Sequence, residues 1–241
     1  MKNYAIITAA GKSERLPGAV PKQFRPIGSK PLLSWTIEKF EQCASVDAII
    51  IVVAEEDLIY VSEFVVDRYD FEKVVKIVPG GKTRFESILR GLRAVPEEAN
   101  IVLVHDGVRP LVSAEDISKV AAEAEVFDAA ILATRQKETL KRGEGGYVIA
   151  TLDRDRIWVA QTPQAFKYEA IISAYIQALD DDREFTDDAS VCEAYGISVR
   201  IVEGDPRNIK VTTPVDLELA RQLLLEEEEA HSKAAQAGGH G

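Results

Sequence analysis

The sequence predicts an α/β fold built on a mostly parallel, twisted sheet that is flanked by helices. Apolar runs such as residues 48–53 are continuous and β-branched, as expected of strands buried on both faces. These runs alternate with amphipathic segments of helical period, which implies parallel pairing and right-handed crossovers. Glycine and proline follow several of the runs, at the strand ends where open α/β sheets place their ligands. The predicted architecture is therefore Rossmann-like.

Each element follows from its local pattern. The predicted strands are residues 4–8, 48–53, 74–78, 101–104, 128–134 and 197–202. The predicted helices are residues 31–41, 56–69, 83–92, 113–126 and 167–179, one that begins at Thr186 or Asp187, and one that begins at Pro214. Pro31 and Pro214 suit the first turn of a helix, and an aspartate or threonine can cap one. Residues 139–152 predict a hairpin, because charged and glycine-rich residues separate two short runs. With its flanks, at about 138–154, this hairpin forms a projecting arm.

Composition indicates one domain with an acidic end. The chain has 241 residues and is 46% hydrophobic, enough for one sizeable core. We expect this domain to cover residues 1–225 and residues 226–241 to be a disordered tail. The formal net charge is −11, of which the tail contributes −3. This balance argues against nucleic acid and anionic membrane as bulk partners, so any anion site must be a local basic pocket.

The cysteines and histidines add little chemistry. Cys43 and Cys192 are far apart in sequence and make neither a disulfide framework nor a metal site, so we expect two reduced, buried thiols in a cytoplasmic protein. No signal peptide or membrane-spanning run is expected. His105 lacks a second histidine at metal-ligand spacing and a nucleophile motif. We therefore expect it to have a hydrogen-bonding role.

The loop after the first strand carries the main functional signal. Its small residues Ala9, Ala10 and Gly11 let a ligand approach the backbone, whose N–H groups can hold phosphate oxygens. Arg15 and Lys22 follow on the same loop and can neutralise a polyphosphate. The combination suggests a nucleoside triphosphate, although a plain turn with solvent-exposed cations would have the same sequence. The loop matches neither of the two commoner phosphate-binding glycine patterns.

Other strand ends carry further candidates. The glycine pair at residues 80–81 can read a base edge through its backbone, with Ser87 adding a hydroxyl, or can simply mark a turn. Asp106 ends another strand and Arg109 follows it, as expected for Mg²⁺ beside phosphate and for an anion clamp. A helix-capping aspartate with a surface arginine is the alternative. Lys210 stands in an apolar context, so it either reaches solvent or points into a site.

These motifs, in this order, resemble the 2-C-methyl-D-erythritol 4-phosphate cytidylyltransferases, a branch of the sugar-nucleotidyltransferase superfamily. The resemblance covers about residues 3–225. Its markers are Ala9-Ala10-Gly11 with Arg15, Pro21-Lys22-Gln23-Phe24, Gly80-Gly81 with Arg84 and Ser87, His105-Asp106 with Arg109-Pro110, Thr162-Pro163-Gln164, Thr186-Asp187-Asp188-Ala189, and Asn208-Ile209-Lys210-Val211-Thr212. The departures are Ser13, Leu16, Lys82 and Gly107-Val108. Of these, Lys82 bears on base selectivity if its side chain contacts cytosine.

The resemblance implies an enzyme that transfers CMP from CTP to methylerythritol phosphate and releases pyrophosphate, in non-mevalonate isoprenoid synthesis. It implies the fold of the nucleotide-diphospho-sugar transferases, Mg²⁺ as cofactor, and a homodimer joined through the arm. The implied catalytic residues are Arg15, Lys22 and Lys210. The implied CTP-binding residues are Ala9, Ala10, Gly11, Gly81, Lys82, Ser87 and Asp106, of which Asp106 is also the candidate metal ligand. The implied acceptor-binding residues are Arg109, Thr139, Arg154, Thr162, Thr186 and Asp187, with Thr139 and Arg154 reaching the site of the neighbouring subunit.

Three other functions fit parts of the pattern. The ribitol-5-phosphate cytidylyltransferases share residues 21–23, 108–110 and 161–164, whereas Trp158 and residues 188–191 look more like the methylerythritol enzymes. A nucleotide-binding regulator without activity is a second alternative, although it has no electrostatic need for all the cations present. A nicotinamide dehydrogenase is disfavoured, because its glycine fingerprint is absent.

Overall fold

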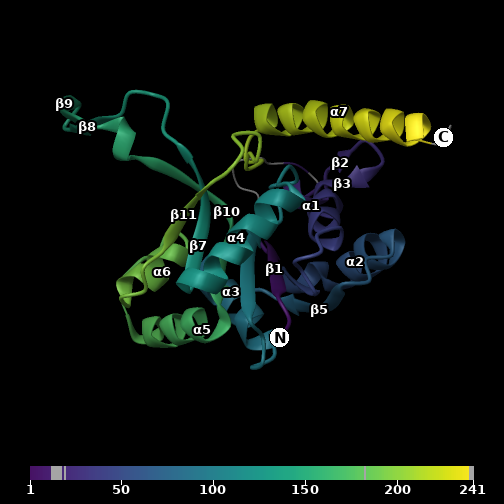
Figure 1. The fold of residues 1–241 in the computed structure, drawn as a ribbon, viewed down its shortest axis with the longest axis horizontal. Helices are drawn as coiled ribbons and strands as arrows, with labels where there is room; N and C mark the ends of the chain where they lie inside the picture. Colours follow the sequence, from purple (N-terminus) through teal and green to yellow (C-terminus); the bar gives the residue numbers. More distant parts are fainter. Residues whose placement is uncertain (12–17, 19, 182, 239–241) are drawn as a thin grey trace.

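A computed structural model describes residues 1–11, 18, 20–181 and 183–238, and side chains to residue 230. Within this part of the chain, a seven-stranded sheet has the order β11-β7-β10-β6-β1-β4-β5 (Figure 1). Its strands are β1 (Tyr4–Ala9), β4 (Ala48–Val53), β5 (Val74–Pro79), β6 (Ile101–Asp106), β7 (Ala129–Arg135), β10 (Trp158–Lys167) and β11 (Arg200–Glu203). The helices are α1 (Leu32–Glu41), α2 (Leu58–Val61), α3 (Arg84–Ala94), α4 (Ala114–Phe127), α5 (Tyr168–Gln177), α6 (Asp188–Ala194) and α7 (Pro214–Gly238).

The sheet is mostly parallel, as predicted. Strand β1 pairs in parallel with β4 on one side and with β6 on the other. The chain therefore moves outward in one direction from β1 to β5, and then returns to place β6 on the opposite side of β1. That reversal creates a switch point between the carboxyl ends of β1 and β6, where α/β sheets bind their ligands. Strand β10 runs antiparallel to β6 and β7. The sequence pattern assigned no element to this strand.

Helices cover both faces of the sheet, and the alternation of side chains along β1 shows how. Ile7 points into a core cluster with α1, α2 and α4, whereas Ile6 points into a second cluster with α3, α5 and α6. Both side chains are fully buried. Because every inner strand faces a helical layer on each side, its sequence reads as continuously apolar rather than alternating. The two layers hold the strand ends, and hence the site, on a rigid base.

Two predicted elements differ from the structure. The segment predicted as one helix over residues 56–69 is a chain of short 3-10, α and π pieces that ends at Asp70, whose φ is 52°. The β-branched pair Val65 and Val66 lowers the helix propensity there. The strand predicted over residues 197–202 begins later, at Arg200.

Helix α7 corrects the prediction of a disordered tail. It begins at Pro214, as expected, but continues through Gly238. Its first half packs Ala220 and Leu224 into a third apolar cluster, and Lys39 on α1 pairs with Glu227 at 2.6 Å. The acidic residues after position 225 are strong helix formers, so they prolong a helix that is already docked. No helix in the described part of the chain is both long and apolar enough to cross a membrane.

The hairpin predicted over residues 139–152 is present as β8 (Lys141–Glu144) and β9 (Tyr147–Thr151). It pairs only with itself and projects away from the body, on the side opposite the end of α7 (Figure 1). Tyr147, Val148 and Ile149 are 81%, 65% and 50% exposed. The arm thus carries an apolar surface that its own chain does not cover. A second small hairpin, β2 (Pro26–Ile27) and β3 (Lys30–Pro31), lies before α1.

Candidate active site

The end of β1 is tied to the turn that carries Lys22. Ala9 closes the strand, and its carbonyl oxygen accepts a hydrogen bond from the side-chain amide of Gln23 at 3.0 Å. This bond fixes the short 3-10 turn η1 (Lys22–Phe24) beside the switch point. Lys22 is half-buried in that turn. Lys22, which the sequence predicted to bind phosphate, is therefore attached to the backbone at the ligand-binding edge of the sheet.

The predicted phosphate loop is described only at its two ends. Gly11 is exposed, and a Cβ added there would meet nothing within 4 Å. The loop backbone at this position is therefore open to a ligand. Arg15 lies outside the described residues, as do all positions from 12 to 17, so its contact with a triphosphate stays a prediction.

Gly80 places the second predicted ligand loop directly against the first. A Cβ on Gly80 would lie 2.6 Å from the Cβ of Ala10 and 3.3 Å from the carbonyl oxygen of Val53. Any larger residue would push the two loops apart, which explains the glycine. The end of β5 and the end of β1 thus share one surface.

Side chains already organise the backbone of this second loop. The hydroxyl of Ser87 accepts the N–H of Gly81 at 3.0 Å and donates to the carbonyl of Thr83 at 2.9 Å. The N–H of Lys82 donates to the carboxylate of Glu86 at 2.8 Å, while the Lys82 side chain is exposed. In this structure Ser87 therefore shapes the loop, and the part of Lys82 that faces solvent is its side chain.

Asp106 lies at the centre of a charge cluster at the end of β6. Its Oδ2 accepts hydrogen bonds from Lys210 Nζ at 3.0 Å and from Arg109 Nε at 3.1 Å. Arg109 also donates through Nη1 to the carbonyl of Asn208 at 2.9 Å. Burial alone would raise the pKa of Asp106, but Lys210 and Arg109, with Arg84 further off, outweigh it and hold that pKa well below its usual value. The carboxylate is therefore ionised, and it brings together two cations that are far apart in sequence.

His105 is buried beneath this cluster and is held as a neutral ring. Its Nδ1 lies 2.9 Å from Thr162 Oγ1, and its Nε2 lies 3.0 Å from the carbonyl oxygen of Arg109. Thr162 Oγ1 accepts the N–H of Asp106 at 3.1 Å, so its own proton is available for His105 Nδ1. Nε2–H must then be the donor to Arg109. The prediction of a hydrogen-bonding histidine is confirmed. Thr162, which was predicted to bind the acceptor, uses its hydroxyl in the hydrogen bonds with Asp106 and His105.

The neutral ring predicts a pH dependence of stability. Burial lowers the pKa of His105 to about 4, from an ordinary value of 6.5. Because the unfolded chain binds a proton between these values and the folded chain does not, the free energy of unfolding should fall as pH drops from 6.5 towards 4, by roughly 3 kcal/mol from this group. Thermal unfolding between pH 7.5 and pH 4.5 measures it. His105→Gln, which keeps one donor and one acceptor, should flatten the curve; an unchanged slope would refute the assignment.

The segment predicted to bind the acceptor begins helix α6. Asp187 is its N-cap, as the sequence indicated: Oδ1 accepts the N–H of Ser190 at 2.9 Å. Its Oδ2 accepts from the side-chain amide of Gln164 at 2.8 Å. Thr186, just before it, is exposed. Asp187 therefore has a structural role in this state, and Thr186 is the more accessible of the two predicted acceptor contacts.

Thr139 and Arg154 lie on the arm, apart from the charge cluster of their own chain. Both are exposed, and Arg154 Nη1 donates to the carbonyl of Lys137 at 2.9 Å. In Figure 1 the arm projects away from the sheet. Within one chain, therefore, the structure does not bring these two residues to the other predicted acceptor contacts.

The sequence interpretation missed three residues beside the site. Gln164, Arg84 and Asp188 belong to the motifs given above, but the sequence assigns no role to any of them. The structure joins them: Gln164 and Arg84 each bind the first turn of α6, where Asp188 is fully buried. The only sequence feature that marks Arg84 and Asp188 is the presence of charged residues at the predicted helix starts. Their pairing could not be predicted, because Arg84 and Asp188 are 104 positions apart.

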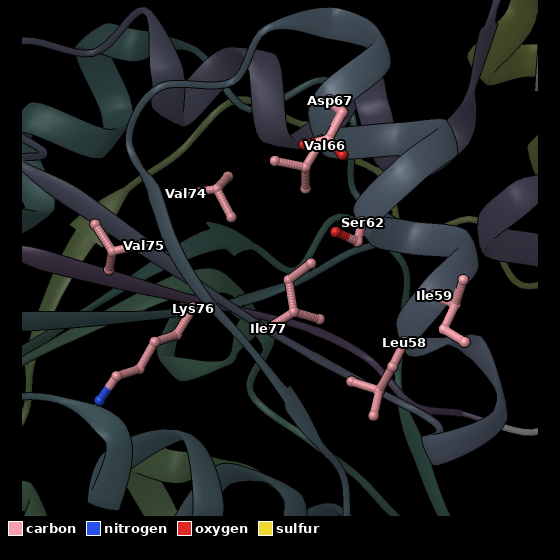
Figure 2. Close-up of a pocket in the computed structure, with 9 residues that line it drawn as sticks. All are labelled: Leu58, Ile59, Ser62, Val66, Asp67, Val74, Val75, Lys76 and Ile77. Atoms are coloured by element: carbon pink, nitrogen blue, oxygen red, sulfur yellow. The ribbon is translucent and has the colours of Figure 1, made fainter.

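A groove away from this site contains none of the predicted ligand-binding residues. It has a volume of about 520 Å³ and lies between β5 and the irregular helix after β4 (Figure 2). Its lining is Leu58, Ile59, Ser62, Val66, Asp67, Val74, Val75, Lys76 and Ile77. Lys76, the one lysine in the lining, directs its ammonium away from the groove to the carbonyl of Ala94 at 3.0 Å (Figure 2). This groove therefore has a mixed lining, in which aliphatic side chains lie beside Ser62 and Asp67, and it holds none of the residues predicted to bind phosphate.

A metal ion at the site would depend on Asp106 and on ligand oxygens. The described residues contain no group of three or more histidine, cysteine, aspartate or glutamate side chains arranged to hold a metal. One carboxylate beside bound phosphates is nevertheless a donor set that Mg²⁺ accepts, since this ion commonly takes one or two carboxylates together with substrate phosphates and water. The residues present fit such an ion.

Comparison with known proteins decides the family. The family model described as 2-C-methyl-D-erythritol 4-phosphate cytidylyltransferase matches residues 4–226. The chain belongs to this family. A cytidylyltransferase of that name from Clostridium botulinum (strain Loch Maree / Type A3) is 41% identical over 224 residues, which cover 92% of this chain and 97% of the relative. The family resemblance drawn from the motifs is confirmed.

Two further relatives agree with the family. The bifunctional enzyme IspD/IspF of Desulforudis audaxviator (strain MP104C) is 44% identical over 221 residues, and the chain spans 56% of its length. The crystal structure of 4-diphosphocytidyl-2C-methyl-D-erythritol synthase from Anaerococcus prevotii DSM 20548 superposes with a TM-score of 0.82 at 31% identity, over 93% of this chain and 96% of that one. This cytidylyltransferase is thus a nucleotidyltransferase with the α/β fold of the family, and its reaction is CTP-dependent cytidylyl transfer to methylerythritol phosphate.

Proposed function

We propose that the edge between β1 and β6 is where CMP passes from CTP to 2-C-methyl-D-erythritol 4-phosphate. The observation that carries this placement is the charge cluster, in which Asp106 holds Lys210 and Arg109 at 3.0 and 3.1 Å beside the switch point. The turn carrying Lys22 is tied to the neighbouring strand end. Two polyanions must meet in this reaction, and converging cations on a rigid sheet edge meet that requirement.

The chemical step needs positioning and charge rather than a base. An ionised oxygen of the acceptor phosphate attacks the α-phosphorus of CTP, a new P–O bond forms, the bond to the β-phosphate oxygen breaks, and pyrophosphate leaves. No proton has to be removed from the nucleophile near neutral pH. This agrees with the state of His105, whose two ring nitrogens are both engaged. The side chains have to stabilise negative charge on the α-phosphate.

Lys210 and Lys22 are our candidates for that stabilisation, together with Arg15. Lys210 has three N–H donors, so its bond to Asp106 leaves donors for a phosphate oxygen. Asp106 then fixes where the ammonium lies. The backbone of residues 9–11 takes the triphosphate, the loop at residues 80–82 with Ser87 takes cytosine, and Arg109 and Thr186 take the acceptor. Asp106 would hold Mg²⁺ together with the ligand phosphates, and the ion would supply further neutralisation of charge.

We further propose that the active site is completed across a homodimer. The arm carries Thr139 and Arg154 away from their own chain's site, and its exposed apolar residues suit burial against a second copy. Exchange of identical arms about a two-fold axis closes the assembly. Arg154 would then add positive charge near the partner's acceptor phosphate.

Release of pyrophosphate tests the reaction. With CTP and Mg²⁺ the protein should release pyrophosphate when methylerythritol phosphate is supplied, and should not do so with ribitol 5-phosphate or without an acceptor. UTP should react more slowly, because the loop at residues 80–82 is proposed to bind the base edge on which cytosine and uracil differ. A continuous coupled assay with all four mixtures makes the measurement. Turnover with ribitol phosphate alone would assign the protein to the ribitol-5-phosphate cytidylyltransferases, and equal rates with UTP would contradict the placement of the base.

A further inference from the structure

One buried ion pair connects the two halves of the proposed site. Arg84 is the first residue of α3, and Asp188 is the first residue of α6. Arg84 donates from Nη1 to Asp188 Oδ1 at 2.9 Å and from Nη2 to Oδ2 at 2.6 Å. Asp188 is fully buried, and the Arg84 side chain is 34% exposed. Two parallel bonds of this kind fix the relative orientation of the two helix starts as well as their distance.

Each end of this pair belongs to a segment with a proposed ligand. Arg84 lies in the nucleotide loop, defined here as residues 80–87, whose backbone is shaped by the bond from Gly81 N–H to Ser87. Asp188 closes the acceptor segment, defined here as residues 185–188. A shift of Arg84 therefore moves the turn expected to hold cytosine, and a shift of Asp188 moves the turn that carries Thr186.

Further contacts make this connection stiff. Gln164 Oε1 accepts the N–H groups of Asp188 at 3.1 Å and Ala189 at 2.9 Å, so β10 holds the acceptor segment from below. The hydroxyl of Tyr175 donates to Asp188 Oδ1. The rings of Phe85 and Tyr175 stack at 4.7 Å beside the ion pair. Hydrogen bonds and a ring contact therefore both connect the two segments.

We propose that Arg84 and Asp188 are positioning residues that couple the nucleotide loop to the acceptor segment, so that each substrate binds to a geometry set partly by the other segment. The proposal rests on the proposed function, which assigns a ligand to each segment. Neither side chain needs to touch a substrate for this effect. An arginine is required, because lysine offers a single point charge and cannot reproduce the two parallel bonds.

The coupling is measured by binding, apart from turnover. The probe is the α,β-methylene analogue of CTP, titrated calorimetrically with and without saturating methylerythritol phosphate. Asp188→Asn, a change on the acceptor side, should weaken binding of the analogue by about tenfold, and Arg84→Lys should do the same. The double variant should also lose about tenfold rather than a hundredfold, because both changes break one interaction. In each variant, the factor by which the acceptor improves binding of the analogue should fall towards one.

Control variants separate coupling from loss of folding. Arg200→Lys alters an ion pair with Glu123 on α4 and should bind the analogue as the wild type does. Tyr175→Phe keeps the Arg84 pair and removes one donor, so it should weaken binding only two- to threefold. Folded variants of Arg84 and Asp188 with wild-type affinity and an unchanged acceptor factor would overturn the coupling alone. A wild-type protein that binds the analogue but transfers no CMP would contradict only the proposed function.

Discussion

Replacing Lys210 by alanine is expected to lower kcat by two to three orders of magnitude, while KM for either substrate changes much less. A donor that stabilises charge developing in the transition state is typically worth about 3–4 kcal/mol, which is this size of effect. Lys22→Ala should behave in the same way. Steady-state kinetics with CTP and methylerythritol phosphate separate kcat from KM.

The Lys210→Ala variant should keep the fold and the ion pair between Asp106 and Arg109. Arg109 remains on Asp106 at 3.1 Å, so the carboxylate keeps one cationic partner and the fold should change little. Lys119→Ala is the matched control, because Lys119 pairs with Glu115 on the surface of α4, where ion pairs have little effect. A Lys210→Ala protein with near-normal kcat and a raised KM would assign this lysine to ground-state binding, contrary to our proposal.

Mixing two inactive variants is expected to restore activity if the arms act in trans. Lys22→Ala and Arg154→Ala subunits should each be nearly inactive alone. After subunit exchange, one site in every mixed dimer has an intact Lys22 and receives Arg154 from the partner. With random exchange, roughly one quarter of all sites should then work. The activity of the mixture, followed over the time of exchange, is the measurement.

Two results would contradict the model of arm exchange. The first is no recovery after exchange has been shown by mass spectrometry of differently labelled subunits. The second is full activity from a species that sedimentation shows to be a monomer. A control mixture of Lys22→Ala with Lys210→Ala should stay inactive, because both lysines are proposed to serve the site of their own chain.

The scaffold of the site could be predicted from the sequence because it depends on local signals. The strand over residues 48–53 was predicted with its observed bounds, since six consecutive apolar residues have no other stable place in an α/β sheet. The helix starts at residue 113 and at Asp187 were also indicated by local residue type. Residues whose role depends only on the nearest strand end or helix start can therefore be predicted from the sequence.

The contacts between distant segments were not predictable from patterns. Thr162 and His105 are 57 positions apart, and no spacing rule connects them. Strand β10 has no recognisable strand pattern, because glutamine, threonine and proline interrupt its apolar run, and its ladder shifts between Ala160 and Gln164. The tail differs from its prediction for a related reason. Its acidic composition suggests disorder, whereas in the structure it continues a helix whose first half packs Leu224 into an apolar cluster.

Helix α7 determines how far the chain can be shortened. Asp216 Oδ2 accepts the N–H groups of Thr212 at 2.9 Å and Thr213 at 2.8 Å, directly after Lys210. Val211 is anchored to Val108 by a backbone bond of 2.9 Å. Leu224 is fully buried, so a truncation that removed it would detach the helix from the body. The segment of residues 211–213, which positions Lys210, would then lose its support. Residues far from any substrate thus set the minimal catalytic length, and an affinity tag is better tolerated after the helix than within it.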